Sequence, residues 1–225
     1  MVHLDAPPGT AYKYCNMNFE VLALLIEAVS GESYETAVNR LVFEPLKITD
    51  AKLFSSDVTK RGLNEVLCYD LPGRTGPSCV PGEEGKTVPY SYGGIDYGPL
   101  DIWCLSILDL VKVYNAFPNL DGDGGLLGNS GKKLLFALPK HDLGLDTAGH
   151  PANWYYSAGV WVNWTGEIGN SRVYFAHSGN QSGSFAGFKG SYSGKTILVL
   201  GNGNDPRFDM ADRLVDKIRS STGSD

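Results

Sequence analysis

The spacing of apolar residues divides the chain into an early helical part and a late part made of strands. Apolar side chains recur at helical spacing over residues 19–29, and again over residues 107–114. This spacing predicts helices with one apolar face each, packed on a core. We expect Asn18 to cap the first helix and Gly31 to end it. A second, shorter helix is expected over residues 34–42.

After position 155 the pattern changes to short runs rich in β-branched and aromatic residues. Four strands are expected, with the sequences YSAGVWVNW, SRVYFAH, SFAGFKG and KTILVLGN. Because the connections are short, neighbouring strands must pair antiparallel. A bend with His177, Gly179 and Gly183 is expected between the second and third strands. A last helix over residues 207–220 completes an α+β fold, an antiparallel sheet flanked by helices, in a single domain spanning residues 1–225.

Two segments between these parts carry weaker patterns. Residues 47–99 are dominated by Gly, Pro, Ser and Tyr, which predicts a long excursion over the surface of the kind that often covers a site. Residues 119–125, NLDGDGG, faintly resemble a calcium loop, but the twelfth position is Ser130 rather than a bidentate glutamate. We therefore interpret this segment as a solvated turn. Ser106 and Asp109 have the spacing of a capping box at the start of the helix that follows position 106.

Composition and charge exclude several classes of partner. The chain has 225 residues and a formal net charge of -6, and it contains no run of lysines or arginines. This argues against a nucleic-acid surface. Its longest apolar runs are far too short to span a bilayer, so no membrane span is expected.

The four cysteines favour neither a metal nor a cofactor. Cys15, Cys68, Cys79 and Cys104 have no CxxC spacing and no neighbouring histidines, so we expect no metal site. Cys68 and Cys79 bracket a loop rich in turn residues, and a disulfide could close it in a secreted or other oxidising compartment. The sequence leaves open both this pairing and the compartment.

Two short motifs are candidates for chemistry. Tyr14 and Asn16 stand two residues apart immediately before the first helix, and His177-Ser178-Gly179 stands where the second strand ends. Taken singly, a tyrosine before a helix is more often a core anchor, and a strand histidine more often a satisfied interior residue. Their order and context along the chain favour a shared functional site.

With these motifs in place, the chain resembles the serine β-lactamase and penicillin-binding-protein superfamily, particularly its class C and esterase-like branch. The likeness covers nearly the whole chain. The segment PGTAYKYCNMNFEVLALLIEAVSGESYETAVNRLVFEPLKI is similar to the family's Tyr-x-Asn segment and helix pair, and LSILDLVKVYNAF to a later capped helix. The strands YSAGVWVNW, FAHSGNQSGSFAGF and KTILVLGN look like the family's final strands, where His-x-Gly commonly replaces Lys-Thr-Gly.

The resemblance implies a β-lactamase/transpeptidase-like fold, a site for acyl transfer through a serine, and a small-molecule or peptide-like substrate. Tyr14 would serve as, or assist, the general base, and Asn16 would orient the substrate or the base. His177 would line the strand edge in place of the family's lysine. Ser178, Gly179 and Asn180 would bind the substrate. Gly179 would let the substrate backbone approach, and the backbone amide of Asn180 would be an oxyanion-hole donor.

The chain departs from the family pattern at the nucleophile. The family's Ser-x-x-Lys motif lies well upstream of Tyr-x-Asn, yet only thirteen residues precede Tyr14 and none is a serine. The one Ser-x-x-Lys here begins at Ser130, where the order is wrong, and we interpret it as a chance match. We therefore expect an incomplete, C-terminal portion of the family fold.

Three hypotheses follow. The first is a β-lactamase-related serine hydrolase acting on an ester, amide or D-amino-acid-type substrate, with the nucleophile supplied from outside this chain. In it, an upstream segment or a second chain would also complete the sheet. The second is a non-catalytic binding or scaffold module that retains the family fold. The third is an unrelated sheet protein, which would require Tyr14 and His177 to lie far apart.

Overall fold

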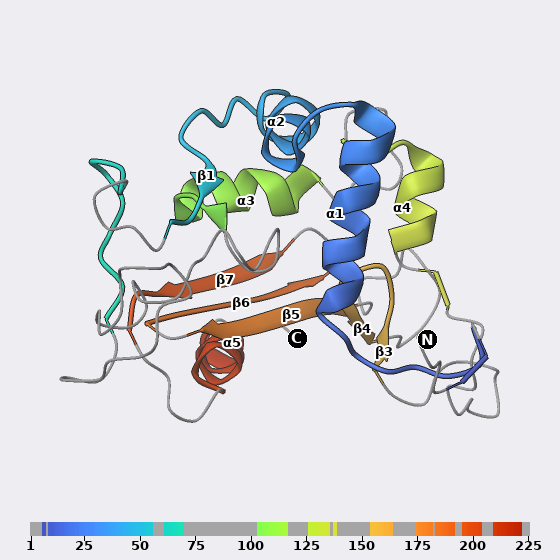
Figure 1. Cartoon of the computed structure of the whole chain (residues 1–225). Coiled ribbons are helices and arrows are strands. Elements are labelled where there is room, and N and C mark those ends of the chain that lie inside the picture. Colours follow the sequence, from blue (N-terminus) through green and yellow to red (C-terminus); the bar gives the residue numbers. More distant parts are fainter. Residues whose placement is uncertain are drawn as a thin grey trace, which may run out of the picture. The chain divides into compact units, whose positions relative to one another are not determined.

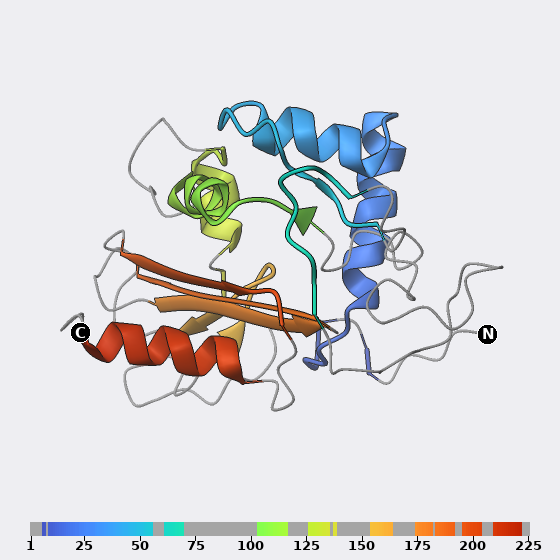
Figure 2. The same ribbon diagram turned by 90° about the vertical axis from the view of Figure 1, so that its left-hand side faces the viewer.

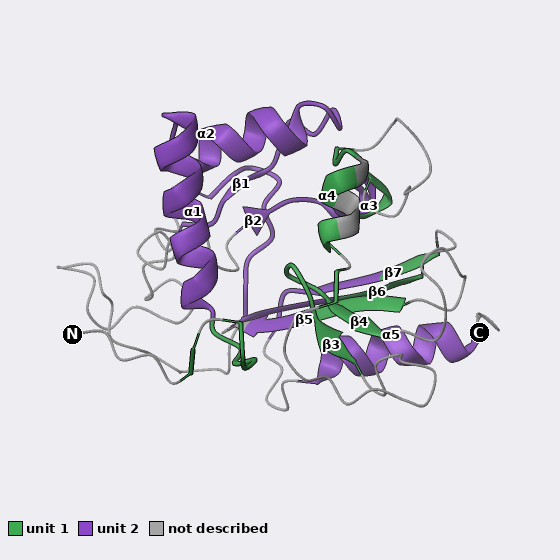
Figure 3. Cartoon of the chain, turned by 90° about the vertical axis from the view of Figure 1, so that its right-hand side faces the viewer, with its two compact units in different colours: residues 1–15, 114–177, 188–197 green, residues 16–113, 178–187, 198–225 purple. Residues whose placement is uncertain are grey.

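The structure is a computed structural model that describes residues 6–7, 9–55, 61–69, 103–116, 126–135, 137–138, 154–163, 174–181, 183–191, 195–203 and 209–221. Its contacts divide the chain into two compact units built from interleaved segments (Figure 3). Unit 1 comprises Met1–Cys15, Tyr114–His177 and Phe188–Ile197. Unit 2 comprises Asn16–Val113, Ser178–Gly187 and Leu198–Asp225. The single domain expected from the sequence stays a prediction.

Helices precede a sheet whose strands follow one another in chain order (Figure 1). The five-stranded sheet has the order β3-β4-β5-β6-β7. Its strands are β3 (Tyr155–Tyr156), β4 (Trp161–Asn163), β5 (Tyr174–Gln181), β6 (Ser184–Ser191) and β7 (Thr196–Gly201). Antiparallel pairing is recorded for β3 with β4 and for β4 with β5. The α+β class and the sheet of sequential strands are therefore confirmed.

Two turns differ from the sequence-based expectation. Residues 156–164 do not form one strand, because Gly159 takes a φ of 90° and turns the chain into the β3–β4 hairpin. Strand β5 runs on to Gln181 rather than bending at His177 and Gly179. The bend lies at Gly183, whose φ of 84° belongs to the left-handed region that glycine adopts at little cost.

The core of unit 1 lies on the meander of strands. Four large apolar side chains, each at most 7% exposed, form it: Tyr155, Val162, Phe175 and Phe188. A Cβ added to Gly190 would lie 2.4 Å from the Phe175 ring, so the absence of a side chain there lets the ring pack against the strand backbone. Burial also raises the pKa of Tyr155 to about 12, which keeps this phenol neutral at ordinary pH.

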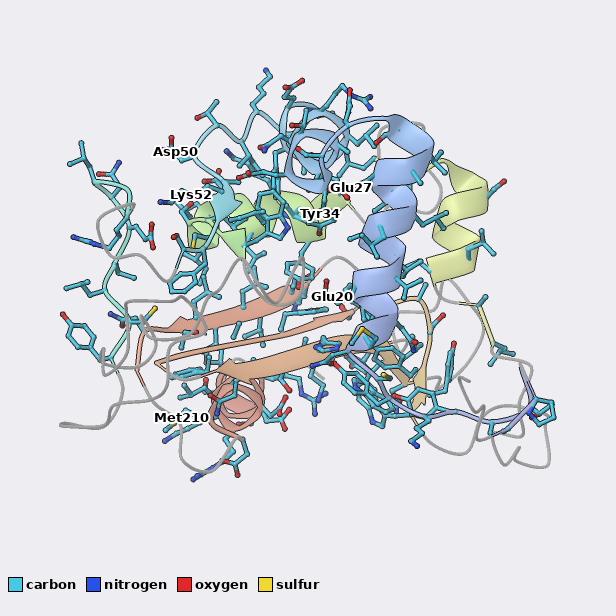
Figure 4. The ribbon with its side chains drawn as sticks, in the orientation of Figure 1. Glu20, Glu27, Tyr34, Asp50, Lys52 and Met210 are labelled. Atoms are coloured by element: carbon cyan, nitrogen blue, oxygen red, sulfur yellow. The ribbon has the colours of Figure 1, made fainter. Side chains whose placement is uncertain are left out.

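Unit 2 begins with a helix pair. Helix α1 (Met17–Ser30) ends at Gly31, whose φ is 71° and whose amide donates to the Glu27 carbonyl. The predicted stop is therefore confirmed. The predicted start is wrong: the N-cap is Asn16, and Asn18 lies inside the first turn. The Glu27 carboxylate accepts from the Tyr34 amide at 2.9 Å and joins α1 to α2 (Figure 4).

The expected second helix forms in two parts. Helix α2 (Tyr34–Val38) starts at Ser33, whose hydroxyl accepts from the Thr36 amide. It continues as a π-helical turn, η1 (Asn39–Phe43). The expectation of a helix over residues 34–42 is met within one residue at its end, although its second half is wound more loosely than an α-helix.

One strand of a small two-stranded sheet lies in residues 47–99, the segment that we expected to be irregular, and its partner lies just beyond it. Strand β1 (Lys52–Leu53) pairs antiparallel with β2 (Trp103–Cys104). Lys52 forms an ion pair with Glu65 at 2.5 Å (Figure 4 labels Lys52). Burial, together with Glu65 and Cys68, raises the pKa of Cys104 to about 12, so this thiol stays protonated at ordinary pH.

Helix α3 (Ile107–Ala116) has the predicted N-terminal cap. The Ser106 hydroxyl accepts from the Asp109 amide at 3.1 Å and contacts the Asp109 carboxylate at 2.7 Å. Hydrogen bonds from Lys112 and Ser106 hold the pKa of Asp109 below its ordinary value. The cap thus adds a charge-assisted contact at the positive end of the helix.

Helix α5 (Met210–Ser221) runs alongside the 178–187 part of the sheet within unit 2 (Figure 2). Its Ala211 and Val215 are buried. A Cβ added to Gly187 would lie 2.7 Å from the Cβ of Ala211, closer than real Cβ atoms approach. This glycine therefore sets the distance between the helix and strand β6.

Helix α1 is unusual because its apolar side chains are largely exposed. Only Ala23 is buried. The exposed large apolar residues of this helix are Met17, Val21, Leu22, Leu24, Leu25 and Val29, with exposed fractions from 50% to 80%. A helix that is apolar on most of its surface is normally buried. The expectation that this helix packs on a core is therefore met only in small part by this chain.

Several expectations fall on residues outside the described ones. Cys79, the proposed partner of Cys68, is among them, as are residues 119–125 of the calcium-like segment and all of residues 70–102. No helix in the described part of the chain has the length and apolar character needed to cross a membrane.

We predict that Gly187→Ala destabilises the protein by about 1–3 kcal/mol, because the added methyl group overpacks the contact with Ala211. Denaturant unfolding of the purified chain measures this change. Gly203→Ala is the matched control, since a Cβ there meets nothing within 4 Å. Combining Gly187→Ala with Ala211→Gly should recover part of the loss, and strictly additive effects of the two changes would contradict the proposed contact.

Candidate active site

The segment before α1 carries the first candidate residue, Tyr14. It belongs to unit 1, and its side chain is 47% exposed. Asn16, two residues further on, caps α1 by position, but its side chain makes no capping hydrogen bond. Because the backbone at Asn16 already has helical angles, φ -59° and ψ -35°, its carboxamide is not in the usual capping geometry. That exposed carboxamide is therefore not used by the cap.

His177 lies on strand β5, and its ring contacts Tyr156 of strand β3. Tyr156 pairs with Trp161 across the β3–β4 hairpin, and Trp161 pairs with Ala176 across β4–β5. Tyr156 is therefore two strands away from the residue that precedes His177. Its hydroxyl lies 3.2 Å from Nε2 of His177, within hydrogen-bond distance.

Tyr14 and His177 meet in unit 1 even though 162 positions separate them in the sequence. Their ring centroids are 6.3 Å apart, with an interplanar angle of 41°. The Tyr14 ring also meets Tyr156 edge-on, at 5.5 Å and 82°. The unrelated-sheet hypothesis required these two regions to lie far apart, and the short separation argues against it.

Tyr12 and Trp161 join Tyr14, Tyr156 and His177 in a set of neighbouring rings. We call these five residues the aromatic cluster. Tyr12 lies 5.7 Å from the Tyr156 ring and 5.8 Å from the Trp161 ring. Tyr156 and Trp161 meet edge-on at 5.0 Å. Such tilted and edge-on arrangements are the favoured geometries for aromatic pairs. The cluster therefore gives both Tyr14 and His177 a firm support.

Sequence reasoning missed Tyr12, Tyr156 and Trp161. Two signals were present: the Tyr-x-Tyr spacing of residues 12 and 14, and the aromatic residues on both sides of Gly159. Reading residues 156–164 as one strand placed Tyr156 and Trp161 on opposite faces, since they are an odd number of positions apart. The hairpin instead makes them direct cross-strand partners.

The strand residues after His177 differ in their surroundings. Ser178 donates to the Asp212 carboxylate at 2.9 Å, within unit 2. Gly179 is exposed, and a Cβ added there would meet nothing within 4 Å, so the backbone is open to an approaching molecule. Asn180 is partly buried. The substrate-binding roles expected for these three residues stay predictions.

Neither the alternative serine nor a metal is favoured by the described residues. Ser130 is exposed near the start of α4 (Asn129–Leu135), and within the described residues no hydrogen bond joins it to the aromatic cluster. No group of three or more potential metal-ligating side chains occurs in the described part of the chain.

Comparison with known proteins supplies the context for this geometry. The Beta-lactamase family model matches residues 2–219. The chain is 24% identical over 188 residues to penicillin-binding protein 4 of Amycolatopsis lactamdurans. The aligned residues cover 81% of this chain and 44% of that protein. It is 34% identical over 64 residues to a D-aminopeptidase of Cereibacter sphaeroides, which covers 28% of this chain and 12% of the relative.

Among solved structures, a penicillin-binding protein from Bacillus halodurans has a similar fold. The TM-score is 0.66 at 19% sequence identity, over 96% of this chain and 58% of that one. The chain thus spans less than two thirds of the length of each of these three proteins.

We predict that Tyr14→Phe lowers the pKa of Tyr12. Burial, and secondly the charge of ionised Tyr14, raise the pKa of Tyr12 above its ordinary value. The substitution removes the second cause and leaves the first, so the pKa should fall without returning fully. Nuclear magnetic resonance of ring-labelled tyrosine over a pH series measures it. Tyr69→Phe, in unit 2, is the control, and an unchanged Tyr12 pKa in Tyr14→Phe would contradict the coupling.

Proposed function

The chain belongs to the β-lactamase family, and from this premise we propose that it forms part of the acyl-transfer site of a serine hydrolase. The observation that carries the proposal is the 6.3 Å approach of the Tyr14 and His177 rings. One group comes from the segment before α1 and the other from strand β5. A phenol and an imidazole so close can act on the same reacting group as proton acceptor and proton donor.

Tyr14 is proposed as the general base, or as its assistant. Its 47% exposed side chain can reach both a substrate and a nucleophile, and its ring is supported edge-on by Tyr156. A phenol in this role takes the proton of the attacking hydroxyl and returns it to the leaving group. Asn16, whose carboxamide the helix cap does not use, is proposed to orient the substrate or the base.

His177 and the residues after it are proposed to bind the acyl group. His177 would donate a hydrogen bond where the family often has lysine. The open backbone at Gly179 supports close approach of the substrate, and the amide of Asn180 would be one oxyanion-hole donor. Because the Ser178 hydroxyl already donates to Asp212, we assign Ser178 a contact through its backbone.

The nucleophilic serine is proposed to come from polypeptide other than these 225 residues. No serine precedes Tyr14 in the sequence, whereas the family's Ser-x-x-Lys stands upstream of Tyr-x-Asn. The exposed apolar side chains of α1 support the proposal, since a covering polypeptide would remove them from water. The same segment could cover α1 and supply the serine.

The proposed substrate class is an ester or amide, including amides of D-amino acids. This follows the family and the relative named D-aminopeptidase.

We predict that a segment carrying Ser-x-x-Lys, fused upstream or added in trans, makes the chain reactive toward a serine-directed acylating probe. Turnover of an activated ester by that assembly should fall by about 10²–10⁴-fold in Tyr14→Phe, the range typical of a lost general base. Mass spectrometry of the labelled serine and steady-state rates measure the two effects. Tyr69→Phe, whose exposed phenol lies in unit 2, is the matched control.

A second outcome would favour the non-catalytic binding or scaffold module. That alternative predicts a folded chain whose ester hydrolysis, if any, does not depend on Tyr14, even with the serine segment present. If a confirmed longer form of the protein lacks Ser-x-x-Lys altogether, the hydrolase proposal is abandoned.

A further inference from the structure

Tyr156 occupies the centre of the aromatic cluster. Its ring lies within 6 Å of Tyr12, Tyr14, Trp161 and His177, with centroid distances of 5.7, 5.5, 5.0 and 5.9 Å. Three of these contacts are edge-on, at interplanar angles between 65° and 82°. Strand pairing fixes its backbone, since Tyr156 faces Trp161 in the β3–β4 register. A side chain held on so many sides has little rotational freedom.

Its hydroxyl is the described hydrogen-bond partner of the His177 ring. The Oη to Nε2 distance is 3.2 Å. Since a neutral imidazole has one donor and one acceptor nitrogen, the role of Nε2 decides which nitrogen carries the proton. A phenol is a better donor than acceptor, so we expect Tyr156 to donate and Nε2 to accept. The proton of neutral His177 then lies on Nδ1, away from Tyr156.

We propose that Tyr156 is a positioning residue that holds His177 in the Nδ1–H tautomer and presents that N–H to the bound acyl group. The His177 role rests on the function proposed above, whereas the tautomer itself does not. Tyr156 would act only through His177 and would not touch the substrate. An imidazole fixed in this way offers a directed donor at the position where the family often has a lysine.

The primary experiment reads the tautomer directly. Nuclear magnetic resonance of the full chain labelled with ¹⁵N-histidine, at a pH well above the ordinary histidine pKa of about 6.5, separates protonated from unprotonated ring nitrogens. His177→Gln assigns the His177 signals among the four histidines. The expected result is an unprotonated Nε2 and a protonated Nδ1 in the unmodified chain.

In Tyr156→Phe the Nδ1–H form should fall from the major to the minor species. Tyr12→Phe is the matched control, because it removes a phenol from the same cluster that makes no hydrogen bond to His177 in the described structure. The tautomer should be unchanged in that control. An unchanged tautomer in Tyr156→Phe overturns the proposal, as does finding Nε2 protonated in the unmodified chain.

A second measurement covers the case in which Tyr156→Phe fails to fold. A fluorinated tyrosine placed at position 156 keeps the ring and has a more acidic, better-donating hydroxyl. The Nε2 signal of His177 should then move further in the direction expected for a stronger hydrogen bond. No movement of that signal overturns the proposal.

Kinetics of the assembly with the serine segment separate this proposal from the proposed function. Tyr156→Phe should lower kcat about tenfold, the scale of one lost hydrogen bond, and leave KM nearly unchanged. If the tautomer shifts but turnover depends on neither His177 nor Tyr156, the positioning holds and the hydrolase proposal fails. If turnover depends on His177 but the tautomer never shifts, the positioning fails alone.

Discussion

The antiparallel pairing of β3, β4 and β5 is the constraint on which the candidate site depends. Tyr156 opposes Trp161, and Trp161 opposes Ala176, so the two registers place Tyr156 two strands from the residue next to His177, whose ring its hydroxyl meets at 3.2 Å. A slip of one residue in either register would turn every following side chain to the other face of the sheet. The buried Val162 and Phe175, which are register partners, oppose such a slip because it would expose them. The apolar core thus fixes the register of the strands that carry Tyr156 and His177.

The tyrosine side of the site is held differently. Tyr14 precedes α1 and is not part of a strand, so no backbone ladder fixes it. Its ring meets Tyr156 and His177, and aromatic contacts of this kind each contribute on the order of 0.5–1.5 kcal/mol beyond burial. The side chain is 47% exposed, so an approaching molecule can reach it without displacing the strands.

The sequence predicted those parts of the fold that depend on local chemistry. Gly31 and Gly183 were recognised because each takes a left-handed φ that other residues avoid, and Ser106 because its hydroxyl suits a helix start. The first helix was started two residues late, since Asn16 and Asn18 are equally good caps by type. The hairpin at Gly159 was missed because the apolar alternation runs on through the turn.

The site was predictable only in part, for a related reason. Motif and order identified Tyr14 and His177, and the structure brings the two rings together. Tyr156 and Trp161 are cross-strand partners because of the position of one turn. No motif at either residue indicates this pairing in the sequence. The exposed apolar surface of α1 was likewise not readable from its periodicity, because periodicity indicates an apolar face without saying which polypeptide covers it.

Gly159 influences the candidate site only through the turn that it forms. This residue has no side chain to contact a substrate, yet its left-handed turn decides that Tyr156 and Trp161 face each other. Evolution could therefore remodel the surroundings of His177 by altering one turn, with every aromatic residue left intact. In related sequences, a change at the position of Gly159 would therefore indicate altered surroundings of His177, as a change in an aromatic residue of the cluster would.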